Sequence, residues 1–468
     1  ADAKYIDVME RTLYNGLISG VSLDGTLFFY PNPLESNGQH HRQPWFGVAC
    51  CPGNITRFLP SVPGYVYAHR GDTLYVNLFA GGKATVETAP GKSVTLVQDT
   101  RYPWDGDVRI TVTPDRARSF PLKVRIPGWA RNEPVPGDLY RFLDANAEPV
   151  TIRVNGTAVP PTVEEGYVTI DREWTPGDVV ELDLPMPVRR IVANDKVDAD
   201  HGRVALQRGP LVYAAEWPDN PNGKVRNIVL PDTNALTPEF RPDLLNGVAV
   251  IKGRAVGLSY DEKGAVQKVE QPFMAIPYAT WANRGRGQME VWIAKADAAA
   301  KPTPAPTLAN TARLSHSAST KFIDNIVSDD EPRASNDGRT YFDWWPRNGC
   351  AAGSSLPTTT AGNEASQRRC SESEWIEMAF AKPSTVSEAA VYWFDDTGRG
   401  GVRVPKSWKL LYKDSTGAWK PVESADAFGV EKDTYNTVHF KPVTATAMRL
   451  ELVMQPAVSA GVQRWRLK

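Results

Sequence analysis

The chain has 468 residues and carries 53 Lys and Arg against 54 Asp and Glu, which leaves a formal net charge of −1. This length is enough for about three domains, and the apolar and charged fractions are those of an ordinary globular protein. The balanced charge gives no basic footprint for nucleic acid, and no run of 18 apolar residues indicates a membrane span, so neither partner is expected.

Residues 1–25 open with helical spacing. Apolar side chains recur there at steps of three and four residues, at Tyr5, Val8, Met9, Leu13 and Leu17. This period predicts a helix that packs on its neighbours, and its apolar face is exposed wherever those neighbours are missing. A short strand is expected next, at 26–30.

Two of the four cysteines, Cys50 and Cys51, stand side by side directly before Pro52. Adjacent residues of a strand point to opposite faces, so both thiols reach one site only if the chain turns at them. Pro52 supplies such a turn, and residues 54–59 predict a short helix after it. The free N–H groups and the dipole of a helix start favour a thiolate, which both a metal and a nucleophilic mechanism require.

Other interpretations of this pair stay open. Buried free cysteine is common and inert, and a vicinal disulfide is strained and rare. Tetrahedral zinc needs three or four protein ligands, whereas Glu35, His40 and His41 lie nearby without a standard spacing. The residues alone therefore indicate either a reactive or metal-bound pair or two structural thiols.

From residue 64 the pattern changes to short alternating runs between Gly and Pro turns. Strands are expected near 65–68, 73–79, 94–97, 108–112, 122–126, 150–154, 167–171 and 179–184. Asn155-Gly156 is a hairpin turn signal. Many short strands at even spacing predict a β-sandwich over 64–215, which the run at 209–213 ends.

The rest of the chain predicts two further parts and a linker. Residues 216–295 hold fewer strands and more loop, and we interpret them as a small accessory β unit docked on the sandwich. Residues 296–312 are rich in Ala, Pro and Thr and form a linker by composition. Residues 313–468 predict a separate β domain.

The strand order of this last domain resembles the discoidin, or coagulation factor V/VIII type C, jelly roll, which several carbohydrate-binding modules share. Trp344, Trp345 and Trp393 are candidate platforms for a sugar ring or, alternatively, core residues, since aromatics dominate β cores. Cys350 and Cys370 flank a loop rich in small residues. A disulfide between them would suit a periplasmic or secreted protein, and two free thiols are the alternative.

Two long motifs, far apart in the chain, resemble glycoside hydrolase family 127, the β-L-arabinofuranosidases, with family 146 as a relative. The first is FFYPNPL at 28–34 followed by HRQPWFGVACCPGN at 41–54, and the second is AIPYATWANRG at 275–285. The resemblance covers about residues 1–295. It implies that residues 1–63 are the end of an (α/α)6 barrel, followed by β-sandwich domains, so the expected fold class is mainly β.

The resemblance also implies a retaining mechanism with Zn²⁺ as cofactor. Cys50 would be the nucleophile, and Cys50 and Cys51 would both bind zinc. Tyr30, His41 and Trp45 are the expected substrate-binding residues, although a core tyrosine is an equally good interpretation of Tyr30. The family takes its general acid/base Glu, and a Glu-x-Cys pair of zinc ligands, from upstream of the stretch that resembles residue 1. We therefore expect this chain to be the C-terminal part of such an enzyme.

Two functions follow as alternatives. The first is a retaining glycoside hydrolase of a bacterial periplasmic or secreted protein, which releases L-arabinofuranose from β-L-arabinofuranosides of a plant glycan. The second is a non-catalytic fragment whose β domains bind carbohydrate or have a structural role. Zinc content and turnover of an arabinofuranoside distinguish the two.

Overall fold

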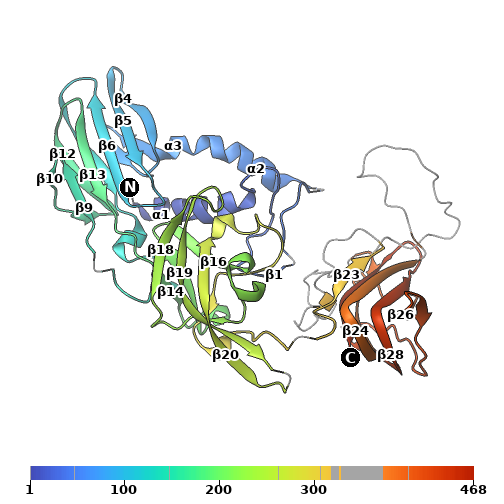
Figure 1. Cartoon of the computed structure of the whole chain (residues 1–468). Coiled ribbons are helices and arrows are strands. Elements are labelled where there is room, and N and C mark those ends of the chain that lie inside the picture. Colours follow the sequence, from blue (N-terminus) through green and yellow to red (C-terminus); the bar gives the residue numbers. More distant parts are fainter. Residues whose placement is uncertain are drawn as a thin grey trace. The chain divides into compact units, whose positions relative to one another are not determined.

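The computed structural model describes residues 2–468 except 39, 47, 147, 262, 306, 318–325, 328–370, 372 and 399 (Figure 1). The chain divides into two compact units, Ala1–Thr303 and Pro304–Lys468, and the division falls inside the segment that composition marks as a linker. Trp344, Trp345, Cys350 and Cys370 lie outside the described residues, so their expected roles stay predictions. The mainly β fold class is confirmed.

The α-helices of the described residues all lie near the start of unit 1. They are α1 (Lys4–Arg11), α2 (Cys50–Phe58) and α3 (Pro63–Val66), with a π-helical turn η1 (Thr12–Leu17) and 3-10 turns η2 (Ile18–Gly20) and η3 (Leu59–Ser61). Tyr5 and Val8 are 70% and 52% exposed, so this part of the apolar face predicted for the first helix lies open, whereas Leu13 is buried. Within the described ranges, none of the helices has the length and apolar character needed to cross a bilayer.

The strand expected at 26–30 does not form. Phe28 makes only single bridges, to Val21 and Gln43. The Asp24 carboxylate accepts hydrogen bonds from the backbone N–H of Thr26 and from its hydroxyl. Such local bonds offer the chain a turn in place of a strand, and the sequence pattern of alternating residues does not reveal them.

Two sheets of unit 1 form the predicted sandwich. One has six strands, in the order β10-β9-β13-β6-β5-β4, and the other has five, in the order β11-β12-β7-β3-β2. The six are β4 (Gly82–Ala89), β5 (Lys92–Thr100), β6 (Asp107–Pro114), β9 (Thr151–Val154), β10 (Thr157–Ala158) and β13 (Asp178–Asp183). The five are β2 (Tyr67–Arg70), β3 (Thr73–Val76), β7 (Arg118–Arg125), β11 (Val163–Glu164) and β12 (Tyr167–Trp174). Alternate residues of both sheets, among them Leu122 and Ile110, share one buried core, as the period of two requires.

The third sheet of unit 1 has eleven strands and corrects the expected boundary near residue 215. They are β1 (Glu35–Asn37), β8 (Tyr140–Phe142), β14 (Arg189–Ala193), β15 (Arg203–Arg208), β16 (Leu211–Glu216), β17 (Ile228–Val229), β18 (Leu236–Arg241), β19 (Val248–Tyr260), β20 (Val266–Pro277), β21 (Gln288–Glu290) and β22 (Ile293–Ala294). β14 to β16 therefore leave the sandwich and join the later strands. β16 pairs with β20 and β21, more than fifty residues further on, and local alternation cannot show such distant partners.

A buried ion cluster joins α1 to the sandwich. Arg125 of β7 is fully buried and its guanidinium contacts Asp7 at 2.6 Å and Glu10 of the same helix. The Tyr102 hydroxyl donates to Glu10 at 2.7 Å, and Arg131 contacts Asp7 at 3.1 Å. Buried charges persist only when they are paired, so this cluster fixes how α1 sits on the five-stranded sheet.

Unit 2 is built on one seven-stranded sheet, in the order β25-β29-β24-β28-β26-β27 with β23 paired to β24. Its strands are β23 (Arg313–His316), β24 (Ser373–Phe394), β25 (Val402–Arg403), β26 (Ser407–Lys413), β27 (Trp419–Pro421), β28 (Tyr435–Val453) and β29 (Ser459–Leu467). Trp393 is fully buried in its core, and the indole N–H donates to the carbonyl of Gly429 at 3.2 Å. The sugar platform considered for Trp393 is therefore wrong. The resemblance to the discoidin fold stays a prediction.

Candidate active site

The two cysteines form the first turn of α2. The helix begins at Cys50, so Pro52 is its third residue and not its first, and the helix starts four residues earlier than the sequence pattern indicates. Within a helical turn, neighbouring side chains lie on adjoining faces, and the two sulfurs are 3.7 Å apart. The Asn54 amide donates to the carbonyl of Cys50 at 3.0 Å, one turn on. The predicted separation of less than about 4 Å is confirmed.

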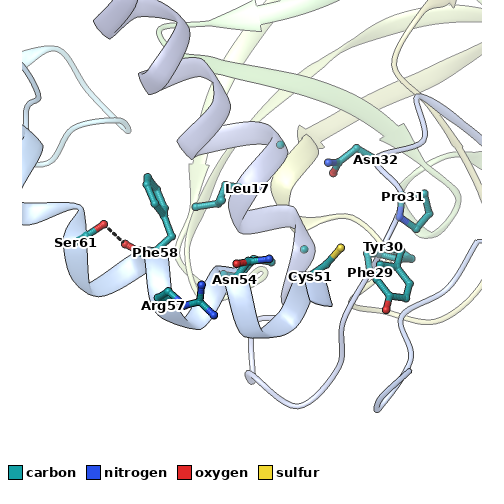
Figure 2. Close-up of a pocket in the computed structure, with 13 residues that line it drawn as sticks. Leu17, Phe29, Tyr30, Pro31, Asn32, Cys51, Asn54, Arg57, Phe58 and Ser61 are labelled. Atoms are coloured by element: carbon teal, nitrogen blue, oxygen red, sulfur yellow. Dashed lines mark hydrogen bonds between the residues drawn. The ribbon is translucent and has the colours of Figure 1, made fainter. Parts of the chain in front are cut away.

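A pocket of about 680 Å³ opens beside this turn (Figure 2). It lies between the α1–η2 segment, the stretch 29–32 and α2. Its lining residues are Gly16, Leu17, Gly20, Phe29, Tyr30, Pro31, Asn32, Cys51, Asn54, Ile55, Arg57, Phe58 and Ser61. None of these is a carboxylic acid, so the described pocket brings a thiol, amides, a phenol and one guanidinium to a ligand.

Tyr30 is the predicted substrate residue that the structure brings to the thiols. It lines the pocket together with Cys51, its ring packs on Phe46 with centroids 4.0 Å apart, and its side chain is 38% exposed. Figure 2 shows Cys51 pointing from the start of α2 toward the segment that carries Tyr30. Partial burial raises the pKa of Tyr30, and negative charge on the neighbouring Cys50 raises it further. The phenol therefore stays protonated and can donate a hydrogen bond.

His41 and Trp45, the other predicted substrate residues, are not among the residues that line the pocket. His41 Nε2 lies 2.6 Å from the Gln43 amide and 3.1 Å from Arg286. Trp45 is 59% exposed and packs edge-on against Phe28 with ring centroids 5.6 Å apart. Neither residue joins Tyr30 on the described pocket wall, and the role of both in substrate binding stays a prediction.

The second sequence motif holds the segment that carries Tyr30. The buried Trp281 ring stacks on Phe29 at 5.1 Å, and the guanidinium of Arg42 lies 4.6 Å from the same Phe29 ring. Arg42 also donates to the carbonyl of Trp281 at 3.1 Å, and the Tyr278 hydroxyl donates to the carbonyl of Pro33 at 2.9 Å. Motifs about 240 residues apart therefore meet at one place.

The geometry of the thiol pair fits two corners of a zinc site. Two sulfurs on one zinc, at about 2.3 Å each and a tetrahedral angle, lie about 3.8 Å apart. The observed 3.7 Å matches that spacing. The described residues contain no group of three or more His, Cys, Asp or Glu side chains arranged for a metal, so Cys50 and Cys51 would supply two ligands of a larger set.

The electrostatics of Cys51 differ from the expectation for a helix start. Partial burial raises the pKa of the Cys51 thiol, and the hydrogen bond and charge of Cys50 raise it further. Without a metal, Cys51 is therefore protonated at neutral pH. Two thiols this close cannot both ionise cheaply, and a cation between them removes that cost.

Glu35, the carboxylate nearest in sequence to the cysteines, is engaged elsewhere. It lies on β1, where it contacts Arg226 at 2.5 Å and Lys301 at 3.3 Å. Burial alone would raise the pKa of Glu35, but these two cations outweigh it and the pKa is lowered. Glu35 is thus an ion-paired carboxylate and not a proton donor to the pocket.

Sequence reasoning missed most of the pocket wall. Asn54, Arg57 and Phe58 lie on one side of α2, at the three- and four-residue steps that a helix starting at Cys50 places together. Asn32, which accepts a hydrogen bond from the Ser19 hydroxyl at 2.6 Å, lies opposite. The spacing of Asn54, Arg57 and Phe58 predicts that they share one side of the helix once its start at Cys50 is known. The position of Asn32 opposite them depends on the tertiary fold.

Three family models match the chain in sequence order. Residues 1–64 match the catalytic domain of the GH127 β-L-arabinofuranosidases, 73–186 their middle domain, and 188–294 the C-terminal domain of glycoside hydrolase family 127. The class that these domains define is that of the glycoside hydrolases, and the matches take in more than half of the chain. Within that class, the chain belongs to glycoside hydrolase family 127.

Named relatives agree with the family. A non-reducing end β-L-arabinofuranosidase of Bifidobacterium longum subsp. longum is 37% identical over 319 residues, which are 62% of this chain and 45% of that protein. A GH127 β-arabinofuranosidase structure is 50% identical with a TM-score of 0.63, over 65% of this chain and 47% of that one. A GH127 β-L-arabinofuranosidase from Geobacillus stearothermophilus T6 is 42% identical with a TM-score of 0.56, over 63% and 46%. The chain spans about half the length of these relatives.

Proposed function

We propose that this chain carries the thiol part of the site of a retaining β-L-arabinofuranosidase. The observation that supports it best is the geometry of the thiol pair. The Cys50 and Cys51 sulfurs lie 3.7 Å apart in the first turn of α2, and Cys51 lines a pocket together with Tyr30. The relatives named above are arabinofuranosidases, and their family model for the catalytic domain matches this stretch. The substrate class proposed is a β-L-arabinofuranoside of a plant glycan.

In the proposed mechanism, the Cys50 sulfur attacks the anomeric carbon of the arabinofuranose. A carbon–sulfur bond forms while the bond to the leaving oxygen breaks, and that oxygen takes a proton from a carboxylic acid. The resulting carboxylate then removes a proton from water, which attacks the same carbon and releases the thiolate. Two displacements at one carbon retain its configuration.

The lining of the pocket includes Cys51 and not Cys50, whose sulfur lies 3.7 Å from that of Cys51. The polar groups of this pocket fit the mechanism. Tyr30, protonated and half-exposed, can donate to a hydroxyl of the sugar, and Asn32, Asn54 and Arg57 offer further polar groups around the pocket. We propose that Cys50 and Cys51 hold Zn²⁺ as two of its ligands. Zinc, when bound, keeps a thiolate deprotonated at neutral pH and sets its basicity.

The acid/base carboxylate and the remaining zinc ligands have no candidate in the described pocket. We propose that they correspond to the half of the relatives that this chain does not match. The chain by itself then has a nucleophile without its partner acid, and loss of acid catalysis alone costs roughly 10²–10⁴ in rate.

The direct test is an assay of the chain with added zinc on an activated aryl β-L-arabinofuranoside and on a natural disaccharide. An aryl leaving group needs little acid help, so we expect weak turnover of the first and nearly none of the second. Cys50→Ser should abolish the weak turnover, while Thr56→Ser on the same helix should leave it unchanged. Equal turnover in Cys50→Ser would refute the nucleophile, and full turnover of the disaccharide would show that the chain contains an acid/base.

Periplasmic or secreted localisation stays a proposal that depends on Cys350 and Cys370. A disulfide between them would support an oxidising compartment. The protein is collected from outside the cytoplasm and digested without reduction. Mass spectrometry of its peptides would show a disulfide-linked pair if the proposal holds and two alkylated thiols if it does not.

A further inference from the structure

One face of the seven-stranded sheet in unit 2 is lined by aromatic and cationic side chains. On β24 the residues Ile376 and Met378 are buried in the core, so their neighbours Trp375 and Glu377 point to the opposite face. The same alternation on β28 places Arg449 on this face, since Met448 and Leu450 are buried.

Strand pairing arranges this outer face in rungs. In one rung Glu377 lies opposite Arg449, and Arg449 opposite Leu411 of β26. In the next rung Ala379, Ala447 and Lys413 follow one another across β24, β28 and β26, with Arg313 at one end and Trp419 at the other. Because strands lie about 4.8 Å apart, Arg313 and Lys413 stand about 14 Å from each other across the two alanines.

Arg449 fixes the two tryptophans. Its guanidinium lies 4.4 Å from the ring centre of Trp375 and 4.2 Å from that of Trp419, and it pairs with Glu377 at 3.0 Å. Both indoles are half-buried on the sheet face. A cation between two rings holds them in one rotamer, so a ligand that contacts them meets a surface ordered in advance.

The charges of this face are unequal. In the three rungs around the tryptophans, four cations, Arg313, Lys409, Lys413 and Arg449, stand with two carboxylates, Glu377 and Glu451. Each carboxylate already has a partner, since Glu377 pairs with Arg449 and Glu451 with Lys409 at 2.7 Å. The described residues give neither Arg313 nor Lys413 an ion pair, and Lys413 lies 5.6 Å from the Trp419 ring centre. Two cations, Lys413 beside Trp419 and Arg313 at the other end of the same rung, are thus left for an external anion.

We propose that this face binds a polysaccharide that carries carboxylate groups. Sugar rings present C–H faces that contact indoles, while carboxylates spaced along the polymer pair with Arg313 and Lys413. A single-stranded nucleic acid would offer charge and rings too, but it binds through a basic groove that follows its backbone, and two unpaired cations about 14 Å apart do not form such a groove. This proposal is independent of the glycosidase site in unit 1.

The test is affinity electrophoresis and calorimetry of the full chain with polygalacturonate, neutral arabinan and a single-stranded oligonucleotide. We expect binding to polygalacturonate that weakens as salt rises, and little binding to the other two. Arg313→Gln with Lys413→Gln should weaken it roughly 5- to 20-fold, since each exposed pair contributes up to about fivefold. Trp419→Ala should weaken it roughly 3- to 10-fold.

The matched control changes the same two residue types elsewhere. Arg116→Gln with Lys432→Gln removes one exposed arginine and one exposed lysine outside these rungs, and affinity should change less than about twofold. Unchanged melting temperatures would show that the Arg313 and Lys413 variants fold. No binding to polygalacturonate, equal binding by both double variants, or tighter binding of the oligonucleotide would each overturn the proposal.

Discussion

Glu290 is a buried carboxylate whose ionisation is unfavourable in the folded state. It is 3% exposed on β21, lies opposite Glu35 across the pairing with β1, and one of its oxygens contacts Arg203 at 2.5 Å. Its other oxygen is buried and has no hydrogen-bond partner among the described residues. Burial raises the pKa of Glu290 to about 7, despite Arg203, and the charge of Glu35 adds to the shift.

This raised pKa predicts a pH dependence of stability. The folded state holds the proton of Glu290 more tightly than the unfolded state, so its stabilising contribution is complete below about 4.5 and is lost as the pH rises through about 7. The loss is of the order of 3 kcal/mol. Glu290→Gln keeps an acceptor for Arg203 and no ionisable group. We expect the variant to gain stability over the natural chain as the pH is raised from 4.5 to 8, measured by urea unfolding, and a constant difference would contradict the assignment.

Residue-level prediction succeeded where the chemistry is local. The turn expected at Cys50 and Cys51 places both thiols within reach of one metal, and the structure confirms that distance. The sequence did not show whether His41 and Trp45 face the pocket, because membership of a motif does not say which of its side chains point into a site. The orientation of each depends on Arg286 and Phe28, which the sequence does not connect to them.

At the scale of elements, the segment 29–33 depends on a motif from the far end of unit 1. Phe29 packs between Trp281 and Arg42, and the Tyr278 hydroxyl bonds the carbonyl of Pro33. The segment itself has little regular structure, so its position depends on these contacts. Tyr30 and Asn32 reach the pocket from it.

Trp281→Leu should therefore loosen this segment selectively. Replacing the buried indole leaves a cavity, and we expect a destabilisation of about 2–4 kcal/mol. In hydrogen exchange, amides of residues 28–36 should exchange faster while those of β6 and β7 keep their protection. A uniform rise of the exchange rate across both regions would show global destabilisation. An unchanged exchange rate at residues 28–36 would show that other contacts hold the segment.

Most strands were predictable because alternation records burial on one face. β5, β6, β7, β12 and β13 lie where the period of two indicates, within the usual uncertainty of their ends. β4 was missed because the more buried positions of its alternation hold only Ala84, Val86 and Thr88, which give a weak apolar signal on a largely exposed strand. The assignment of β14 to β16 to the sandwich was wrong because both faces of β15 and β16 are largely buried, and local pattern carries no record of their partners.

The whole molecule consists of two units whose buried clusters are separate. Unit 1 buries side chains of the sandwich and the eleven-stranded sheet, and unit 2 buries those of the seven-stranded sheet. Composition predicted a division at 296–312, since Ala and Pro cannot supply a core there. The sequence could not assign the eleven-stranded sheet, whose strands come from residues 35 to 294.

Separate cores predict separate unfolding. Calorimetry of the full chain should resolve two transitions, because each unit buries its own apolar residues. Arg125→Met leaves Asp7 and Glu10 buried without their shared cation, which costs about 3–5 kcal/mol, and should lower the temperature of one transition only. Equal shifts of both transitions would show that the units unfold together.

The central claim is that the Cys50 thiolate attacks the sugar, and mass spectrometry of the covalent intermediate tests it most directly. The chain is incubated with zinc and an activated aryl β-L-arabinofuranoside, quenched in acid, digested and sequenced by fragmentation. We expect a pentosyl group on Cys50, none on Cys51, and no adduct in the Cys50→Ser variant. Turnover of the substrate with no adduct on Cys50, or with the pentosyl group on another residue, would contradict it.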